Sequence, residues 1–274
     1  MVLRYARKFT SIDGTEVVTF PLAERRAITT QFLRSALFPV PGRNYPIRAL
    51  AYGAGLKAES RETISFVLMD PNRKPTTVDA KWDTMKSTLY SIGVGKLWSY
   101  DEQENMRWAW AYIEQMPTAP TYASINRYHL DVTVTFIRIS DWYGATAMTP
   151  SSVAIAASPT TFTLSNVGNA PVYNPVFTVF GVYSQVSIYN STTGHYMIQQ
   201  RTGASANDGI RFSPGVPSVE RTTDAGVTWT GDYANFLRVT GQVRMMEIAP
   251  GDNAFSVAGI TNGTLSIDAY PAYH

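Results

Sequence analysis

Apolar and polar residues alternate with a period of two in the most regular segments of this 274-residue chain. In segment 128–136 the alternate apolar positions are Leu130, Val132, Val134 and Phe136. Segment 62–69 follows the same pattern, and segment 105–113 places Trp108, Trp110 and Tyr112 on one face. This period is that of a strand with one buried face, so it predicts a fold that is mainly β.

One segment between these strands has the period of a helix instead. Its apolar residues recur three and four positions apart, at Trp82, Met85, Leu89 and Ile92. Thr76 and Asp79 form a candidate capping pair at its start, and Gly93 can end it in a left-handed conformation. The first part of the chain is therefore predicted to be β-rich α+β, with one helix packed on a mostly antiparallel sheet.

The charged residues are unevenly divided between two parts of the chain. Residues 1–145 hold 18 Lys and Arg and 14 Asp and Glu, a net charge of +4, whereas residues 146–274 hold five Arg, no Lys and seven acidic residues. An uncharged stretch containing Pro150 and Pro159 separates them, which is typical of a linker or an extended edge segment. A net charge of +4 is too small to indicate a nucleic-acid-binding protein. We predict a first domain over 1–145, a linker over 146–160 and a second domain over 161–274.

Short apolar runs separated by Gly, Asn, Pro or Asp fill the second domain. The predicted strands are 162–164, 176–180, 186–189, 197–198, 227–229, 236–239, 244–248, 255–257 and 264–270. About nine strands in ~115 residues predict a β-sandwich or a jelly roll. Segment 204–226, which has few apolar residues, is predicted as a long loop. In the first domain, the Pro- and Gly-rich segment 38–47 is predicted as a loop or the tip of a long hairpin.

The residues that catalysis usually needs are scarce. The chain has no cysteine, which removes disulfides, thiolate metal sites and cysteine nucleophiles. The three histidines, His129, His195 and His274, lack metal-ligand spacing, and we expect each to be exposed or simply hydrogen-bonded. Nucleophile-elbow and phosphate-loop motifs do not occur in the sequence. We therefore expect no enzymatic activity, no cofactor and no metal.

Two other functions stay open for the second domain. Paired carboxylates on a β-sandwich could make a glycosidase, with candidates at Glu220, Asp224, Asp232, Glu247 and Asp268. Acidic residues between strands are more often turn formers. Exposed aromatic rings could instead stack on sugars, with candidate sugar contacts at Trp229, Tyr233 and Tyr173. The same rings could equally fill the core of the sandwich.

The sequence shows no sign of a membrane segment or an export signal. No apolar run approaches the ~20 residues of a membrane span, and Arg4, Arg7 and Lys8 occupy the place where a signal peptide needs apolar residues. We therefore expect no membrane partner and folding in a reducing cytoplasm.

Two turn motifs of the second domain resemble those of a known family. Residues 166–171 read Asn-Val-Gly-Asn-Ala-Pro, and residues 249–253 read Ala-Pro-Gly-Asp-Asn. Each leads into an alternating strand, and together they resemble the galectin-like C-terminal domain of siphophage distal tail proteins. The first domain is similar to the N-terminal split-barrel domain of that family in segments 89–98, 106–110 and 136–143.

The resemblance implies a structural protein of the phage virion. Proteins of this family form a ring, usually a homohexamer, at the distal end of the tail tube. Their N-terminal domains line a channel through which DNA passes transiently, and their C-terminal domains point outward. The ring joins the tail tube and tape measure proteins to the tail-tip hub and receptor-binding proteins, and the particle is assembled in the host bacterial cytoplasm. The alternative function is a carbohydrate-binding, lectin-like protein of two β domains.

Overall fold

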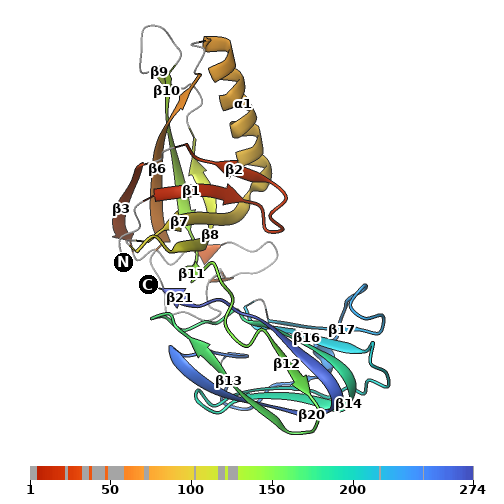
Figure 1. Ribbon diagram of the computed structural model, residues 1–274. Coiled ribbons are helices and arrows are strands. Elements are labelled where there is room, and N and C mark those ends of the chain that lie inside the picture. Colours follow the sequence, from red (N-terminus) through yellow and green to blue (C-terminus); the bar gives the residue numbers. More distant parts are fainter. Residues whose placement is uncertain are drawn as a thin grey trace. The chain divides into compact units, whose positions relative to one another are not determined.

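The computed structural model describes residues 5–21, 24–32, 37–38, 47–48, 59–70, 74–101, 103–116, 121–122, 129–215, 217–242 and 244–273 (Figure 1). The chain folds into two compact units. The first contains the described residues up to 32 and those from 59 to 145. The second contains the described residues from 146 to 273, together with 37–38 and 47–48. The prediction of a mainly β fold is confirmed.

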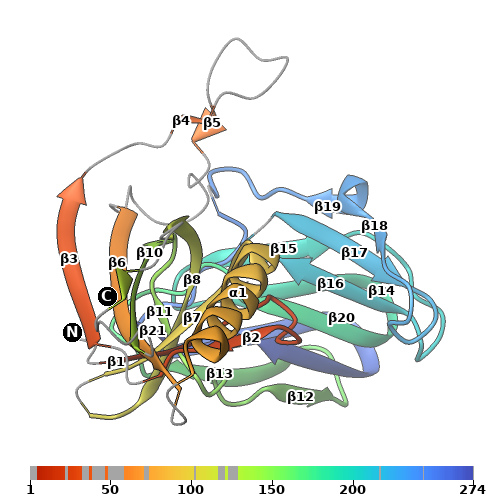
Figure 2. The same ribbon diagram turned by 90° about the horizontal axis from the view of Figure 1, so that it is seen from above.

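The first unit is built on one curled antiparallel sheet, seen from above in Figure 2. Its strands run in the order β2–β1–β7–β8–β10–β6–β3. Their bounds are β1 (Tyr5–Thr10), β2 (Val17–Thr19), β3 (Glu24–Phe32), β6 (Glu59–Met69), β7 (Val94–Tyr100), β8 (Met106–Gln115) and β10 (His129–Arg138). Two short strands extend it, since β9 (Thr121–Tyr122) pairs with β10 and β11 (Trp142–Gly144) pairs with β8.

The alternating segments of the sequence supply the core of this unit. Ile64, Phe66 and Leu68 of β6 are at most 5% exposed, as are their β10 counterparts Leu130, Val132, Val134 and Phe136. Helix α1 (Pro75–Ile92) packs against β2, β6 and β10 and buries Val78, Trp82, Leu89 and Ile92. The predicted helix and the two predicted strands are therefore confirmed, because each period matches the face that the element buries.

The predicted capping pair of the helix is wrong. The N-cap is Lys74, which makes no side-chain capping bond, and Pro75 is the first helical residue. Thr76 and Asp79 therefore lie inside the first turns. Proline is common at this position because its ring fixes φ near the helical value, and because the N–H of the first helical residue makes no hydrogen bond within the helix. The helix ends where predicted, at Gly93, whose φ of 60° is positive, but its ψ of −104° is not that of the predicted left-handed helical conformation.

The second unit is organised around two long strands, β14 (Val176–Asn190) and β20 (Gly251–Asp268), which pair with each other along most of their length. Their remaining partners are β12 (Ser152–Ile155), β13 (Thr160–Asn166), β15 (His195–Gln199) and β16 (Gly209–Ser213). Beyond these lie β17 (Ser218–Thr222), β18 (Thr230–Gly231), the single-turn helix η1 (Tyr233–Asn235), β19 (Phe236–Leu237) and β21 (Ala272–Tyr273).

Each long strand changes partners along its length. The start of β14 pairs with β16 and its end with β15, while the start of β20 pairs with β13 and its end with β12. The change coincides with two glycines of positive φ, Gly181 at 145° and Gly259 at 85°. Glycine permits these bends, which carry each strand from one layer of a sandwich into the other. The sequence predicted two separate strands, one on either side of each bend. In the structure the two predicted strands at Gly181 form the continuous strand β14, and the two at Gly259 form the continuous strand β20.

Three other predictions for this unit are wrong. Segment 204–226 contains the hairpin of β16 and β17, because Ile210, Phe212 and Val219 alternate inward and are at most 1% exposed. Segments 227–229 and 244–248 are not strands; Ile248 forms only an isolated bridge to Val172. The hairpin escaped sequence analysis because each strand has only five residues and its turn is rich in Gly and Pro.

Two further segments bear on the sequence predictions. The main part of the second unit begins at residue 146, so the stretch expected to be a linker supplies the edge strand β12. In the Pro- and Gly-rich segment, β4 (Leu37–Phe38) pairs antiparallel with β5 (Ile47–Arg48). The residues between these two strands lie outside the described part of the chain.

Candidate functional site

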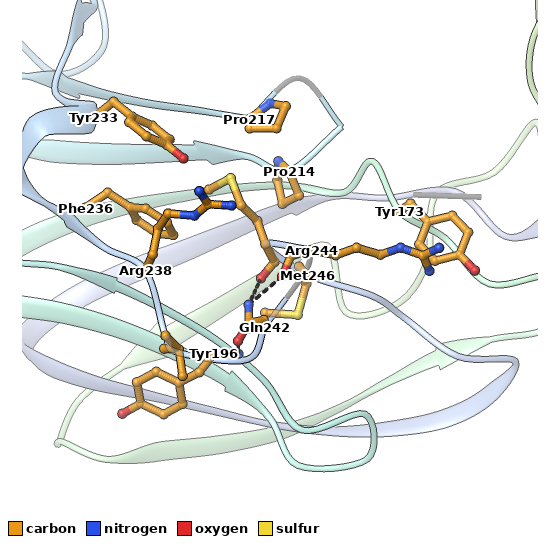
Figure 3. Close-up of a pocket in the computed structure, with 12 residues that line it drawn as sticks. Tyr173, Tyr196, Pro214, Pro217, Tyr233, Phe236, Arg238, Gln242, Arg244 and Met246 are labelled. Atoms are coloured by element: carbon orange, nitrogen blue, oxygen red, sulfur yellow. Dashed lines mark hydrogen bonds between the residues drawn. The ribbon is translucent and has the colours of Figure 1, made fainter. Parts of the chain in front are cut away.

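A pocket on the second unit brings together aromatic and basic side chains (Figure 3). It encloses about 110 Å³ and is lined from β15, from the β16–β17 turn and from the chain after η1. We call it the tyrosine pocket. Its main lining residues are Tyr173, Tyr196, Tyr233, Phe236, Arg238 and Arg244.

A buried carboxylate positions one end of the tyrosine pocket. Asp232 is 6% exposed and accepts hydrogen bonds from Gln199 Nε2 at 2.7 Å, Arg201 Nη1 at 3.0 Å and Asn235 Nδ2 at 2.6 Å. These bonds fix the start of η1, on which Tyr233 stands. The ring of Tyr233 packs on Phe236 with a centroid distance of 5.5 Å. The aromatic end of the pocket is therefore held by a network that is itself buried.

The other end holds a stacked arginine. The guanidinium of Arg244 lies 4.1 Å from the centroid of the Tyr173 ring, and its Nη1 is 3.1 Å from Glu247 Oε2. The positive charge of Arg244 is thus balanced by a carboxylate and covered by a ring.

The floor between the two ends is tied together by an amide. Gln242 accepts a hydrogen bond from the backbone N–H of Tyr196 at 2.8 Å and donates to the carbonyls of Arg244 and Met245 at 2.6 and 2.8 Å. Its hydrogen-bonding groups are therefore committed to the protein, and its role is structural.

Arg238 differs from the other arginines of the pocket region. Its side chain is exposed and forms no ion pair with any residue that the structure describes. Figure 3 shows it at the same end of the pocket as Tyr233 and Phe236, with its guanidinium directed toward the lining residues. The sequence carried one signal for it: Arg238 is a lone cation between Leu237 and Val239 in an otherwise apolar run.

The pocket unites two of the three aromatic residues singled out as sugar contacts. Tyr173 and Tyr233 both line it. Trp229 lies elsewhere: its ring contacts Phe180 at a centroid distance of 6.0 Å, and the guanidinium of Arg211 stacks over it at 4.2 Å. Sequence analysis did not find Phe236, Arg238, Gln242 or Arg244, because the turns that bring them together are decided by tertiary contacts.

The candidate carboxylates of a glycosidase occupy separate positions with their own partners. Glu220 pairs with Arg211 at 2.7 Å, and Glu247 and Asp232 pair with arginines as described above. Asp224 accepts hydrogen bonds from Thr222 Oγ1 and from the backbone N–H of Thr228, and chiefly the first lowers its pKa to about 2. Asp224 is therefore an ionised turn former rather than a proton donor at neutral pH. Asp268 lies at the exposed end of β20; burial raises the pKa of Tyr270, and the charge of Asp268 adds to this shift.

The histidines form no cluster in the described residues. The Nδ1 of His195 is 3.0 Å from Thr193 Oγ1, and burial lowers the pKa of this imidazole. His129 begins β10, and His274 lies outside the described residues. No group of three or more potential metal-ligating side chains occurs among the described residues. A search of the same residues also finds no helix with the length and hydropathy of a membrane span.

The first unit has a second candidate surface, a row of aromatic and lysine side chains across its sheet. Lys8 is opposite Trp98, Trp98 is opposite Trp108, and Trp108 is opposite Tyr143. The Nζ of Lys8 lies 4.8 Å from the Trp98 ring centroid. We call this row, with its neighbours Lys96 and Trp110, the aromatic ladder.

The aromatic ladder lies on the face of β8 opposite to Ala109 and Ala111. Its centre is buried, since Trp108 is 4% and Tyr143 9% exposed, and its partly exposed members are Lys8, Lys96, Trp98 and Trp110. Ala109 and Ala111 point to the core and are 0% exposed, whereas Trp110 is half-buried. Lys96 Nζ is 4.8 Å from the Trp108 ring centroid and 5.5 Å from that of Trp110. Trp108 and Trp110 therefore share one face, as the alternation predicted, and the small alanines leave room for the core side chains beneath.

The two turn motifs of the second unit are each closed by an asparagine. Asn166 accepts a hydrogen bond from the N–H of Gly168 at 3.0 Å and donates to the carbonyl of Ala170 at 2.9 Å. Asn253 accepts from the N–H of Ala249 at 2.9 Å and donates to its carbonyl at 2.8 Å. The motifs on which the family resemblance rests are thus structural turns with buried amide side chains.

Comparison of the sequence with protein-family models gives no match, and a search of the curated proteins gives none either. Solved structures do match. The Dit protein of phage SPP1, described as a paradigm of the hub adsorption apparatus in phages that infect Gram-positive bacteria, aligns with a TM-score of 0.56 and 10% identity over 90% of this chain and 91% of its own.

The phage P2 baseplate supplies two further matches, both in its activated conformation. The structure with Ca aligns with a TM-score of 0.54 and 10% identity, covering 98% of both chains. The structure with Sr gives a TM-score of 0.52 and 9% identity, covering 97% of this chain and 98% of that one. The likeness that the turn motifs predicted is confirmed at the level of structure: this chain has the fold of the hub and baseplate proteins of these phages.

Proposed function

We propose that this chain is a structural, non-enzymatic protein of the distal end of a phage tail. The observation that carries the proposal is the extent of the fold likeness, which includes both units and spans at least 90% of this chain and of each hub or baseplate chain it matches. A shared arrangement of two different β units over the whole length is a stronger argument than the likeness of one common β-sandwich.

In this role copies of the chain form a ring, with six the expected number, that joins the tail tube and tape measure proteins to the tail-tip and receptor-binding proteins. A closed ring needs a heterologous contact, in which one surface of a subunit meets a different surface of the next. The aromatic ladder is our candidate for one of these surfaces. Tryptophan and tyrosine side chains give the largest contributions at protein interfaces, and Trp98 and Trp110 remain half-buried within the isolated chain.

The first unit would line the channel through which DNA passes. Residues 1–145 carry a net charge of +4, and this count includes Arg48 of β5, which belongs to the second unit. Each phosphate contact releases counterions and adds to affinity, so a strongly basic lining would retain DNA. A weakly basic one permits passage without holding the nucleic acid.

Electron microscopy tests this proposal directly. The purified chain should form rings with a central opening, and its mass in solution should be a multiple of the 30.3 kDa subunit. Antibodies against it should label the distal end of the tail on intact virions. A chain that stays monomeric at all concentrations and is missing from purified virions would overturn the proposal.

A further inference from the structure

One positive charge in the tyrosine pocket has no carboxylate partner among the residues that the structure describes. Arg244 pairs with Glu247 at 3.1 Å, and Arg201 pairs with the buried Asp232 at 3.0 Å. Arg238 has no such carboxylate among the described residues, although it stands beside Tyr233 and Phe236 (Figure 3). A guanidinium is weakly hydrated, and its planar fork can bind a carboxylate or a phosphate with two parallel hydrogen bonds.

The same end of the pocket presents flat aromatic faces. Tyr233 is 41% exposed although its ring packs on Phe236. Tyr173 is half-buried at the opposite end. Because η1 is fixed by the hydrogen bonds of Asp232, the Tyr233 ring is held in place before any ligand arrives, which lowers the entropic cost of binding.

The size of the pocket limits what can enter. Its volume of about 110 Å³ is well below the ~300 Å³ at which pockets for drug-sized molecules begin. It suits one ring-sized group that lies partly outside the pocket, with the remainder of a larger molecule in solvent.

We propose that the tyrosine pocket binds an acidic saccharide, with the sugar ring stacked on Tyr233 and a carboxylate or phosphate of that sugar held by Arg238. The two features act together, since a neutral sugar leaves Arg238 without a partner and a simple anion leaves the ring of Tyr233 exposed. Tyr173 and Tyr233 are both candidate sugar contacts in the sequence, and the proposal retains them and adds Arg238. The third candidate, Trp229, lies outside the pocket. The proposal concerns the second unit alone and does not depend on the proposed ring.

Ligand-observed NMR with the full chain tests the proposal. The probes are glucuronate, glucose 6-phosphate, glucose and inorganic phosphate. We expect saturable binding of glucuronate, glucose 6-phosphate or both, and at least about tenfold weaker binding of glucose and of inorganic phosphate. The two acidic sugars distinguish a carboxylate ligand from a phosphate ligand.

Matched variants assign the binding to this pocket. Arg238→Ala and Tyr233→Ala should each weaken the binding of the acidic sugar at least about tenfold, and Arg238→Lys should restore part of it because charge returns without the planar fork. Arg221→Ala removes one positive charge from β17, outside the pocket lining, and Tyr90→Ala removes a ring that is 64% exposed on α1. Both controls should bind as the wild type does. Since Arg238 is exposed and has no ion pair among the described residues, its variants should keep the unfolding midpoint of the wild type, whereas Tyr233→Ala also loses the packing on Phe236, so its midpoint is measured beside its binding.

Several results would overturn the proposal. Equal affinities for glucose and glucuronate would show that the ligand needs no anionic group. Equal affinities for inorganic phosphate and glucose 6-phosphate would show that it needs no sugar ring. If the Arg238→Ala and Tyr233→Ala variants both bind the probes as the wild type does, the ligand binds outside the tyrosine pocket. If no saccharide binds while an acidic peptide does so in an Arg238-dependent way, the pocket is a docking site for protein instead.

Discussion

Asn190 donates a hydrogen bond from Nδ2 to Asn253 Oδ1 at 3.2 Å, and both side chains are 0% exposed. The first residue ends β14 and the second lies near the start of β20, so this bond joins the two long strands of the second unit at one end. Asn190 also donates to the carbonyl of Glu247 at 2.8 Å. The pair therefore fixes the turn that leads into β20 against the end of β14.

Asn253→Ala should destabilise the second unit by about 3 kcal/mol, because it leaves the N–H and carbonyl of Ala249 and the amide of Asn190 without their partner in a buried place. Urea unfolding followed by circular dichroism measures the effect. Asn207→Ala is the matched control, since Asn207 is exposed and its side chain makes no hydrogen bond to any described residue. A change in the control within about 0.5 kcal/mol is expected. Equal effects of the two substitutions would contradict the role assigned to Asn253.

Gly259→Ala should destabilise the second unit by at least about 3 kcal/mol. Gly259 has a φ of 85°, and a Cβ at this position would lie 1.7 Å from the carbonyl oxygen of Gln185. The substitution combines a disfavoured backbone conformation with a clash against backbone that cannot move away. Gly231→Ala is the control, because no atom lies within 4 Å of its added Cβ and its φ is not positive. A thermal unfolding midpoint unchanged in Gly259→Ala would show that the bend of β20 does not need glycine.

Tyr183 should make the stability of the fold fall at alkaline pH. Burial, with the charges of Asp208 and Asp232 adding to it, raises the pKa of its phenol from 10.0 to about 12. The unfolded chain therefore loses this proton at lower pH than the folded chain. The stabilisation is complete below pH ~10 and is lost as the pH rises toward about 12.

Tyr183→Phe should accordingly show a smaller loss of unfolding free energy than the wild type between pH 10 and 12, the interval between the two pKa values. Urea unfolding at fixed pH steps provides the measurement. Tyr90→Phe alters an exposed tyrosine and should follow the wild-type curve. An identical slope in Tyr183→Phe and the wild type would argue against a titration of Tyr183 linked to folding.

Trp110→Ala should weaken ring assembly while leaving the monomer folded. The Trp110 ring meets Trp108 edge to face at 5.4 Å but is half-buried, so it offers area to a neighbouring subunit. Loss of an interface tryptophan typically costs more than about 2 kcal/mol of binding free energy, and the subunit dissociation constant should rise at least about tenfold. Sedimentation velocity at a series of concentrations measures it, with Tyr90→Ala as the control for loss of an exposed ring in the same unit. Rings of undiminished stability in Trp110→Ala would remove the aromatic ladder from the interface.

The period of apolar residues predicts an element correctly where one face of that element is buried along its whole length. Strand β10 and helix α1 are examples, because the period of Leu130, Val132, Val134 and Phe136 differs from that of Trp82, Leu89 and Ile92. The same period does not reveal short strands that are buried by segments distant in the sequence. The β16–β17 hairpin looked like a loop, since five residues on each side of a turn carry too few apolar positions to display a period.

Turn chemistry was readable in part. The motifs around Asn166 and Asn253 predicted tight turns, and the asparagine side chains close them as such residues commonly do. The predicted helix start is wrong, because Thr76 and Asp79 have the spacing of a capping pair but Pro75 already begins the helix. Spacing alone does not say which residue adopts the first helical conformation.

The sequence by itself determined the mainly β class, the single long helix and the turn motifs of the second unit, because each depends on residues close together in the chain. Only the tertiary structure decided that β14 and β20 are continuous through Gly181 and Gly259, since those bends depend on the close approach of another backbone segment. It alone also assembled the tyrosine pocket. Tyr173, Tyr233 and Arg238 are up to 65 positions apart in the sequence, and they meet because a buried carboxylate and an amide fix the chain on either side of them.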